Sequence, residues 1–185
     1  MGKIEDLAVL YGEHIEISWQ RSIASAQKVI TVIYPKDIER TLRARVGEFE
    51  QRTRSAGHEW VEFDCTQIFA KWMANDDYRE AYFECPDDLP MKLEGEFPGH
   101  VAEALRKVLL KAGENSVVAM TGIASLYGFL RISELLPDIE RDIQGRLVVF
   151  FPGSKDSNNY RLLDARDGWN YLATSISLHG TGTEA

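Results

Sequence analysis

The chain has 185 residues, which is the length of roughly one domain. Hydrophobic residues make up 44% of it and charged residues 27%, values typical of a globular protein and not of a disordered one. Lys and Arg number 21 and Asp and Glu number 29, so the formal net charge is −8. That balance excludes a generally basic nucleic-acid coat, although not a local basic patch, and we expect one domain over residues 1–185.

Cysteine usage and hydropathy define the expected compartment. Cys65 and Cys85 lie outside any C-x-x-C pair, so the sequence contains no zinc-ribbon or redox motif. We expect free thiols in a reducing cytosol. No signal-peptide-like run opens the chain, and no stretch approaches ~18 consecutive apolar residues. The sequence therefore predicts a soluble, cytoplasmic protein without a membrane-spanning segment.

The first half of the chain alternates between predicted helices and strands. An apolar stripe at helical spacing predicts a helix over 3–19, and the β-branched run at 28–34 predicts a strand. A helix to about residue 55 and a short strand at 59–63 follow. Asp64 and Gln67 have the spacing of a capping box for the next helix, which is predicted to end near residue 83.

The second half begins with an acidic segment at 84–97, whose prolines and glycine predict irregular structure. The next elements predicted are a helix from Pro98, a buried strand at 116–120, a helix at 126–136 that is apolar nearly all round, and a strand at 146–151. A hairpin at 160–173 and a flexible tail at 175–185 complete the chain.

Strands that alternate with helices predict right-handed crossovers and a parallel sheet. The expected fold is a three-layer α/β sandwich with a mainly parallel sheet of about four strands plus a C-terminal edge hairpin.

Ligands of such sheets bind beyond the carboxyl ends of the strands, so the loop that begins at Thr121 is a candidate site. Thr121–Gly128 has the strand, glycine and helix order of a phosphate-binding turn. Compared with a P-loop, its second glycine is one residue late and Phe129 replaces the lysine. A structural turn is the favoured interpretation, and anion or nucleotide binding is the alternative.

The polar segment after the strand at 146–151 is a second candidate. Lys155 and Arg161 are suited to a phosphate, and carboxylates are suited to magnesium, although Asp and Asn are also ordinary turn formers. The candidate anion- or nucleotide-binding residues of the two loops are Thr121, Gly122, Ser125, Lys155 and Arg161. The candidate magnesium ligands are Asp156, Asp164 and Asp167.

Other catalytic and binding patterns match poorly. Gly122-Ile-Ala-Ser125 lacks nucleophile-elbow spacing, and the four histidines show no H-x-x-x-H spacing. The predicted helix at 36–54 carries five arginines, but interleaved glutamates cancel much of that charge, so direct nucleic-acid binding is not favoured. Those arginines are Arg40, Arg43, Arg45, Arg52 and Arg54.

Residues 76–96 contain eight acidic side chains against Arg79 and Lys92, a local charge of 2 − 8 = −6. A solvated loop and a docking surface for a basic partner both explain this run. The candidate partner-binding residues, which include part of the apolar helix, are Asp76, Asp77, Asp87, Asp88, Leu126, Phe129 and Leu130.

Three strings in the C-terminal half are distinctive. They are Val117–Leu136 (VVAMTGIASLYGFLRISELL), Gly145–Gly153 (GRLVVFFPG) and Asn158–Leu172 (NNYRLLDARDGWNYL). Together with Glu39–Arg45 and the acidic stretch, they resemble the BrxB family, small components of bacteriophage exclusion (BREX) defence systems. The resemblance extends from about residue 3 to 179.

The resemblance implies an accessory role. Such systems combine a DNA methyltransferase, a phosphatase-like protein, a large ATPase and small accessory proteins, and they mark host DNA and block phage replication. The family carries no established catalytic residues, so the resemblance implies a non-catalytic assembly module without a cofactor. Its expected partners are other BREX components, above all the phosphatase-like protein or the ATPase. The sequence does not define the oligomeric state. A nucleotide- or metal-dependent enzyme with a degenerate phosphate-binding loop is the alternative.

Overall fold

Short β-branched runs form the centre of the computed structural model, which describes residues 2–20, 22–156, 159–163, 169–178 and 180–182. The run at 29–34 forms β1 (Val29–Tyr34), and all six of its residues are buried. The strands at its two sides are β4 (Arg146–Asp156) and β7 (Thr174–Ser177), and both are parallel to it. Burial on both faces explains why β1 has no alternating polar pattern.

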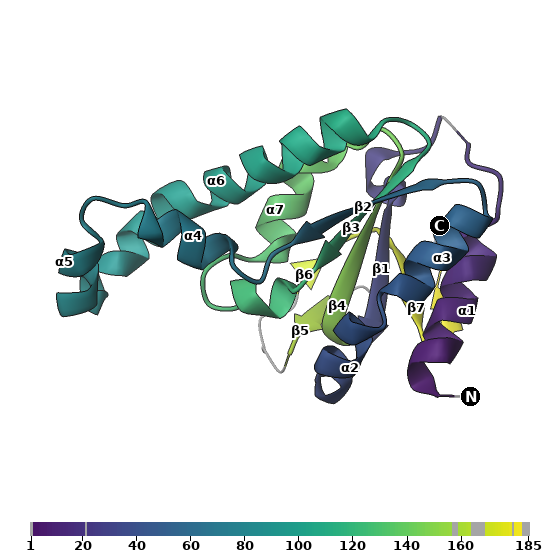
Figure 1. Ribbon diagram of the computed structural model, residues 1–185, viewed down its shortest axis with the longest axis horizontal. Coiled ribbons are helices and arrows are strands. Elements are labelled where there is room, and N and C mark those ends of the chain that lie inside the picture. Colours follow the sequence, from purple (N-terminus) through teal and green to yellow (C-terminus); the bar gives the residue numbers. More distant parts are fainter. Residues whose placement is uncertain (1, 21, 157–158, 164–168, 179, 183–185) are drawn as a thin grey trace.

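The main sheet has the strand order β2-β3-β4-β1-β7-β8 (Figure 1). Neighbours are parallel from β2 (Glu59–Asp64) through β3 (Ser116–Thr121) to β7, and β8 (Gly180–Gly182) runs antiparallel to β7. The end of β4 continues beyond the sheet and pairs antiparallel with β5 (Asn159–Leu162), which pairs with β6 (Trp169–Asn170). The predicted mainly parallel sheet and the hairpin are confirmed, but five parallel strands replace the four expected.

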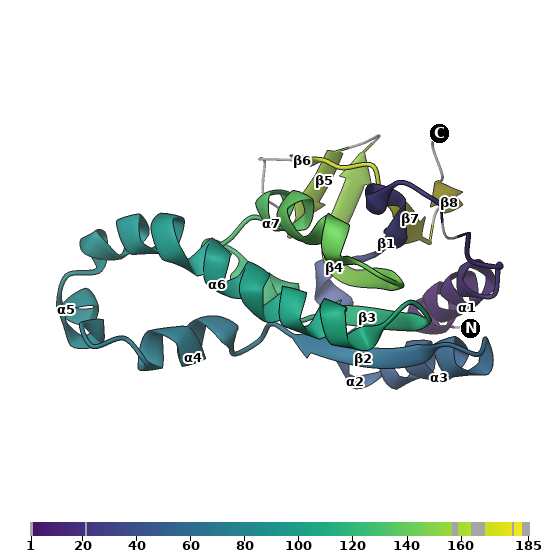
Figure 2. The same cartoon turned by 90° about the horizontal axis from the view of Figure 1, so that it is seen from above.

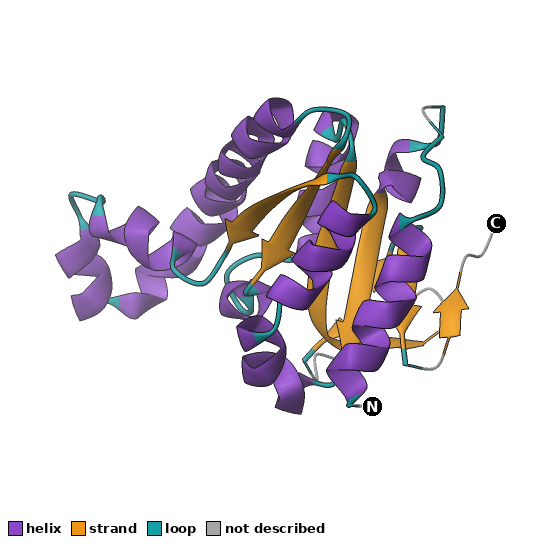
Figure 3. Ribbon diagram, turned by 45° about the vertical axis from the view of Figure 1, so that its right-hand side comes forward, coloured by secondary structure: helices purple, strands orange, loops and turns teal. Residues whose placement is uncertain are grey.

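Helices cover both faces of the sheet, as Figure 3 shows. One face packs against α1 (Lys3–Ile15), α2 (Glu39–Ala44) and α3 (Gly47–Ser55), and the other packs against α6 (Leu89–Ala112) and α7 (Ile132–Ile139). Alternate residues of each strand enter the two cores: Val148 and Phe150 of β4 lie in the first, Leu147 and Val149 in the second. This arrangement confirms the three-layer sandwich.

The described part of the chain also contains five short 3-10 turns. They are η1 (Ser25–Lys28), η2 (Lys36–Ile38), η3 (Pro86–Asp88), η4 (Ile123–Leu126) and η5 (Glu140–Asp142). The helix expected at 126–136 is therefore wrong in its first half, because η4 ends at Leu126 and α7 begins only at Ile132. Pro137 lies inside α7, beyond the predicted end.

A helical arm extends from one end of the sheet (Figures 1 and 2). It consists of α4 (Ile68–Ala74), α5 (Arg79–Glu84), η3 and the first part of α6. We call residues 68–97 the arm and residues 76–96 its distal part. The segment predicted to be irregular at 84–97 is thus mostly helical, since Pro90 occupies the first helical turn and Pro98 is accommodated inside α6.

The predicted tail begins too early. Residues 175–177 belong to β7, which is buried and pairs with Ile30, Thr31 and Val32 of β1, so the expectation of a flexible tail from residue 175 is wrong for this part. Residues 183–185 lie outside the described part of the chain. Across the described ranges, no helix combines the length and apolar composition needed to cross a lipid bilayer.

Candidate functional site

The carboxyl ends of β2 and β3 carry the first predicted site. Thr121 is buried at the end of β3 and donates its hydroxyl to Oε1 of Glu62 at 3.0 Å, and its carbonyl accepts the Cys65 N–H at 2.9 Å. Ser125 is half-buried in η4, and its backbone N–H bonds the Gly122 carbonyl. The Thr121 hydroxyl is therefore engaged with a carboxylate of the neighbouring strand.

Gly122 adopts a left-handed conformation, with φ at +67°. A Cβ atom here would lie 2.9 Å from Cγ2 of Thr66 and 3.0 Å from Oδ1 of Asp64. Asp64 in turn accepts hydrogen bonds from the hydroxyl and the N–H of Thr66, which makes a tight turn and not the predicted capping box with Gln67. The glycine thus lets two loops pack closely, which is the structural-turn interpretation of the sequence.

A shallow pocket of about 400 Å³ lies beside Thr121. Arg40 and Arg43 of α2 line one part of it, and Glu62 and Asp64 line another. Burial alone would raise the pKa of Asp64, but the two hydrogen bonds from Thr66 and the charges of Arg43 and Lys71 lower that pKa below its usual range. With two guanidinium groups facing two carboxylates, the pocket has no net excess of charge for a polyanionic ligand.

The β4–β5 ribbon holds the other predicted phosphate ligands. Nζ of Lys155 donates to Oγ of Ser175 at 3.0 Å and lies 5.3 Å from the ring centre of Tyr160. Lys155 pairs with Tyr160 and Ser154 with Arg161, so Lys155 and Arg161 project from opposite faces of the ribbon.

The two loops also lie far apart along the sheet. Met120 pairs with Val149, and Lys155 comes six residues later, on the order of 20 Å along the strand. The structure therefore does not bring Lys155 together with Thr121 and Gly122. Asp156 is exposed at the end of β4, and Asp164 and Asp167 lie outside the described residues.

The histidines occupy separate places. His14 lies on α1, His100 lies on α6, and His58 stacks on Trp19 at 3.7 Å with its Nδ1 2.6 Å from Oδ1 of Asn115. His179 lies outside the described residues. Within the described ranges, no three His, Cys, Asp or Glu side chains gather in a way suited to a metal ion. Cys65 is buried and Cys85 exposed, and both are free thiols as predicted.

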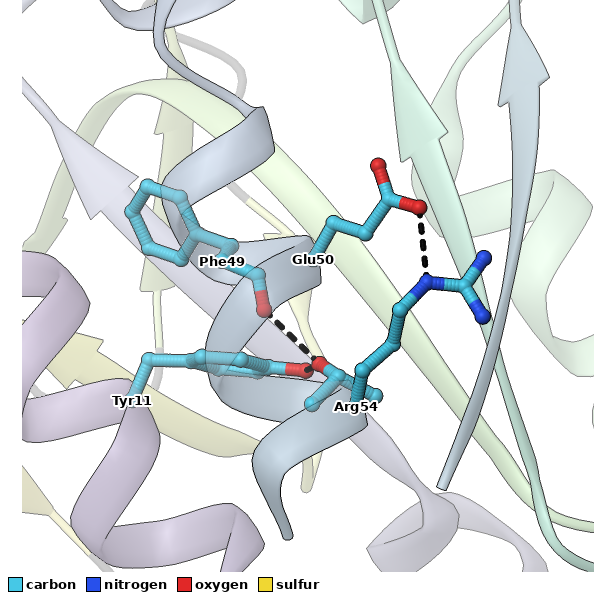
Figure 4. Close-up of polar contacts among 5 residues, drawn as sticks. Tyr11, Phe49, Glu50 and Arg54 are labelled. Atoms are coloured by element: carbon cyan, nitrogen blue, oxygen red, sulfur yellow. Dashed lines mark hydrogen bonds and ion pairs between the residues drawn. The ribbon is translucent and has the colours of Figure 1, made fainter. Parts of the chain in front are cut away.

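Glutamates pair with part of the arginine-rich region. Arg54 donates Nε to Oε1 of Glu50 at 2.9 Å, and Arg45 contacts both Glu5 and Glu48 (Figure 4 shows the first pair). On the inner face of α3, the Thr53 hydroxyl lies 2.6 Å from the Tyr11 hydroxyl and donates to the Phe49 carbonyl. This helix therefore uses one face for packing and much of the other for internal ion pairs.

The arm carries the predicted acidic surface. Asp76 bonds Nζ of Lys92 at 2.7 Å, and Glu96 bonds the same nitrogen at 2.9 Å. Nζ of Lys92 also lies 5.4 Å from the ring centre of Trp72 and 5.9 Å from that of Tyr82. The contact with Lys92 lowers the pKa of Asp76, and Asp76 and Glu96 raise the pKa of Lys92. Asp77, Asp87 and Asp88 are exposed.

Three large apolar side chains of the distal arm are also exposed. Tyr78 is 72% exposed, Phe83 64% and Met91 83%. None of the three is among the binding residues predicted from the sequence, although apolar residues without helical periodicity inside a strongly acidic run are a usable signal. These residues give the arm the mixed apolar and charged surface typical of a docking element.

The predicted apolar partner-binding residues lie elsewhere. Leu126 and Leu130 are buried in the core, so burial explains the apolar string better than partner contact. Phe129 is half-buried and stacks on Phe69 of α4 at 4.1 Å, where it joins the base of the arm to the body. Beside it is a cleft of about 690 Å³ between arm and body, whose lining includes Glu94, Pro98, Tyr127, Phe129, Arg131 and Leu162.

Comparison with known proteins supports the resemblance seen in the sequence. No curated protein and no solved structure matches the chain. The sequence model of the family described as BREX protein BrxB matches residues 66–176, from the base of the arm to β7. The matched segment covers 176 − 66 + 1 = 111 of 185 residues. It includes the arm, the cleft and the carboxyl end of β3, and the chain therefore belongs to the BrxB family of BREX proteins.

Proposed function

We propose that this protein is a non-catalytic accessory component that assembles with other components of a BREX complex in the cytoplasm through protein–protein contacts. Membership of the BrxB family supports involvement in BREX defence. The phosphatase-like protein and the large ATPase are the partners we expect first.

The observation that carries this proposal is the arm. It projects from the body (Figure 2). Its side chains Tyr78, Phe83 and Met91 are exposed within an acidic stretch of the chain. Soluble proteins seldom place several large apolar side chains on a projecting element unless another surface covers them. The arm is also anchored, since Phe69 and Trp72 pack on Phe97 at 5.6 and 5.0 Å between ring centres. An anchored projection with apolar side chains is suited to assembly.

The sheet edge supports the non-catalytic part of the proposal. Thr121, Gly122 and Asp64 are explained by their contacts with Glu62 and Thr66. Lys155 contacts Ser175 and the Tyr160 ring. Three of the residues first considered for nucleotide binding, Thr121, Gly122 and Lys155, thus have structural contacts, and these lie at separate places.

Co-purification tests the proposal. The protein, tagged at its N-terminus, is purified from cells that express the complete BREX system, in parallel at 0.1 and 0.5 M salt. We expect at least one other component of the system to be retained in stoichiometric amount. Recovery of the tagged protein alone at both salt concentrations would contradict the proposal.

A thermal-shift measurement addresses the enzymatic alternative. A nucleotide at ~100 times its dissociation constant stabilises a folded protein by ~2.7 kcal/mol, which raises the melting temperature. We expect no shift with ATP or GTP in the presence of magnesium. A clear shift that is lost in an Arg40→Ala, Arg43→Ala double variant would instead favour nucleotide binding at the sheet edge.

A further inference from the structure

We infer that the distal arm docks into an apolar pocket of a partner protein whose rim carries Lys and Arg side chains. This inference rests on the proposed function and adds which surface makes the contact and what chemistry receives it. The apolar side chains are the anchors, and the acidic side chains around them select the partner.

The anchors are concentrated on the arm. Residues 76–96 are a short part of the chain, yet they contain three of the large apolar side chains that are most exposed in the described structure: Tyr78, Phe83 and Met91. Tyr78 precedes α5, Phe83 lies within it, and Met91 lies in the first turn of α6. Aromatic side chains that enter a partner's pocket supply most of the affinity of many interfaces.

The arm is pre-organised for docking. Lys92, whose side chain is only 14% exposed, joins Asp76 at the start of the distal arm to Glu96 at its end, and it contacts Trp72 and Tyr82. Leu93 and Phe97 of the same helix are buried in the core on this face of the sheet, and Met73 at the end of α4 is also buried. A helical element that is already ordered loses little conformational freedom on binding, which favours affinity.

The remaining carboxylates define the partner's charge. Asp76 and Glu96 are occupied by Lys92, and Glu80 contacts Arg79. Among the described residues, no ion pair is found for the other acidic side chains of the distal arm, which are Asp77, Glu84, Asp87, Asp88 and Glu94. A rim of Lys and Arg on the partner would complement these charges and accelerate the encounter.

The charge distribution also argues against other occupants. The distal arm carries −6, so the rest of the chain carries −8 − (−6) = −2. Nucleic acid and anionic membranes would be repelled by the arm. A second copy of this chain offers another acidic arm and a body that is itself weakly negative. A basic heterologous protein is the occupant that the charges favour.

The test uses the complete protein and the other components of its own BREX system, co-expressed from an operon that lacks only this gene. One variant combines Tyr78→Ala with Phe83→Ala, and a second combines Asp87→Lys with Asp88→Lys. Ile17→Ala combined with Leu110→Ala removes two apolar side chains of the body that are 63% and 55% exposed, and this variant is the control. Unchanged circular dichroism and melting temperature verify that each variant is folded.

We expect the Tyr78, Phe83 variant to weaken binding to the retained component by about 30-fold or more, the loss typical of removed anchor residues. The Asp87, Asp88 variant should bind about tenfold more weakly at 0.1 M salt, and its defect should shrink at 0.5 M because salt screens charges beyond a few ångströms. The control should bind within about twofold of the wild type.

Three outcomes would overturn the inference, and they differ in what they say about the proposed function. If both arm variants bind like the wild type, the inference fails while the assembly role stands. If light scattering shows a dimer that the Tyr78, Phe83 variant abolishes, the arm's occupant is a second copy. If the wild type retains no component at all, the proposed function and the inference fail together.

Discussion

The sheet and the arm bury their side chains to very different extents. All six residues of β1 and all six of β3 are buried, and the helices on both faces exclude water from the strands. The distal arm buries Leu93 but leaves Tyr78, Phe83 and Met91 in solvent and depends on the contacts of Lys92. The sheet therefore forms the packed scaffold, and the arm presents the exposed apolar side chains that the proposed docking requires.

Removing a core aromatic side chain should have the largest effect. Phe150 of β4 is buried and packs edge-on to Phe49 of α3 at 4.9 Å. Phe150→Ala should lower the free energy of unfolding by about 3–5 kcal/mol because a cavity remains between the sheet and its helices. Denaturant unfolding monitored by circular dichroism measures this loss. Met91→Ala on the arm is the control and should change the free energy of unfolding by less than about 0.5 kcal/mol. If the two variants lost equal stability, the distinction between the sheet and the arm would be wrong.

The next largest effect should come from the turn after β3. Gly122→Ala combines an unfavourable positive φ with contacts near 3 Å to Asp64 and Thr66, and we expect a loss of about 2–3 kcal/mol. Gly57 has a similar φ of +85° but open space where a Cβ would stand, so Gly57→Ala should lower stability by only about 1 kcal/mol. Thermal unfolding of the two variants separates conformational strain from close packing. A milder effect at Gly122 than at Gly57 would show that the loops do not pack as described.

Loss of the Lys92 contacts should loosen the arm without unfolding the sheet. In Lys92→Met, amide exchange over residues 68–97 should accelerate by about five- to tenfold, because α4 and α5 lose their shared cation. Hydrogen–deuterium exchange read by mass spectrometry resolves the arm from strands β1, β3 and β4, where rates should stay unchanged. Lys107→Met removes an exposed i,i+4 pair with Glu103 and should leave both regions unaffected. Faster exchange throughout the sheet would mean that arm and body unfold as one unit.

The smallest effect concerns pH. Burial, reinforced by the charge of Arg146, lowers the pKa of His14 below its ordinary value of 6.5. The imidazole of His14 therefore takes up a proton more readily in the unfolded chain than in the folded one. As a result, the free energy of unfolding has its full value above pH 6.5 and decreases as the pH falls below 6.5. His14→Gln should flatten the dependence of stability on pH between 7 and 5.5, measured by urea unfolding.

The arm provides the contrast over the same pH range. The pKa of Asp76 is lowered by its hydrogen bond with Lys92, so that ion pair persists over this pH range and is lost only as the pH falls through the lowered pKa. Exchange rates of the arm should therefore stay constant between pH 7 and 5.5 after correction for the intrinsic pH dependence. An arm that opens before the body loses stability would contradict the role given to Lys92.

Local patterns predicted the elements that are buried on both faces. Continuous β-branched and aromatic runs predict the first residues of β1, β3 and β4 to within one position. Such runs are recognisable because a strand that is covered on both faces has apolar residues at successive positions. The turn at Gly122 is also predictable from local sequence, because a turn with a positive φ favours glycine.

Long-range contacts explain what the sequence analysis missed. Thr174–Ser177 contains a single large apolar residue, Ile176, and appears polar in isolation. It becomes a buried strand because β1 supplies the neighbouring backbone groups, and the buried Thr31 of β1 lies opposite Ser175. In the same way, the sequence predicts that Phe129 and Leu130 contact a partner, but Phe129 stacks on Phe69 of α4 and Leu130 is buried in the core.

For the candidate site, the sequence by itself determined the acidic character of residues 76–96, the turn at Gly122 and the family of the chain. Only the tertiary structure separated Lys155 from Thr121, extended the acidic segment as a helical arm and exposed Tyr78, Phe83 and Met91 on it. The physical reason is that charge and backbone preference are local properties of a residue, whereas exposure and proximity depend on which distant segments pack against it.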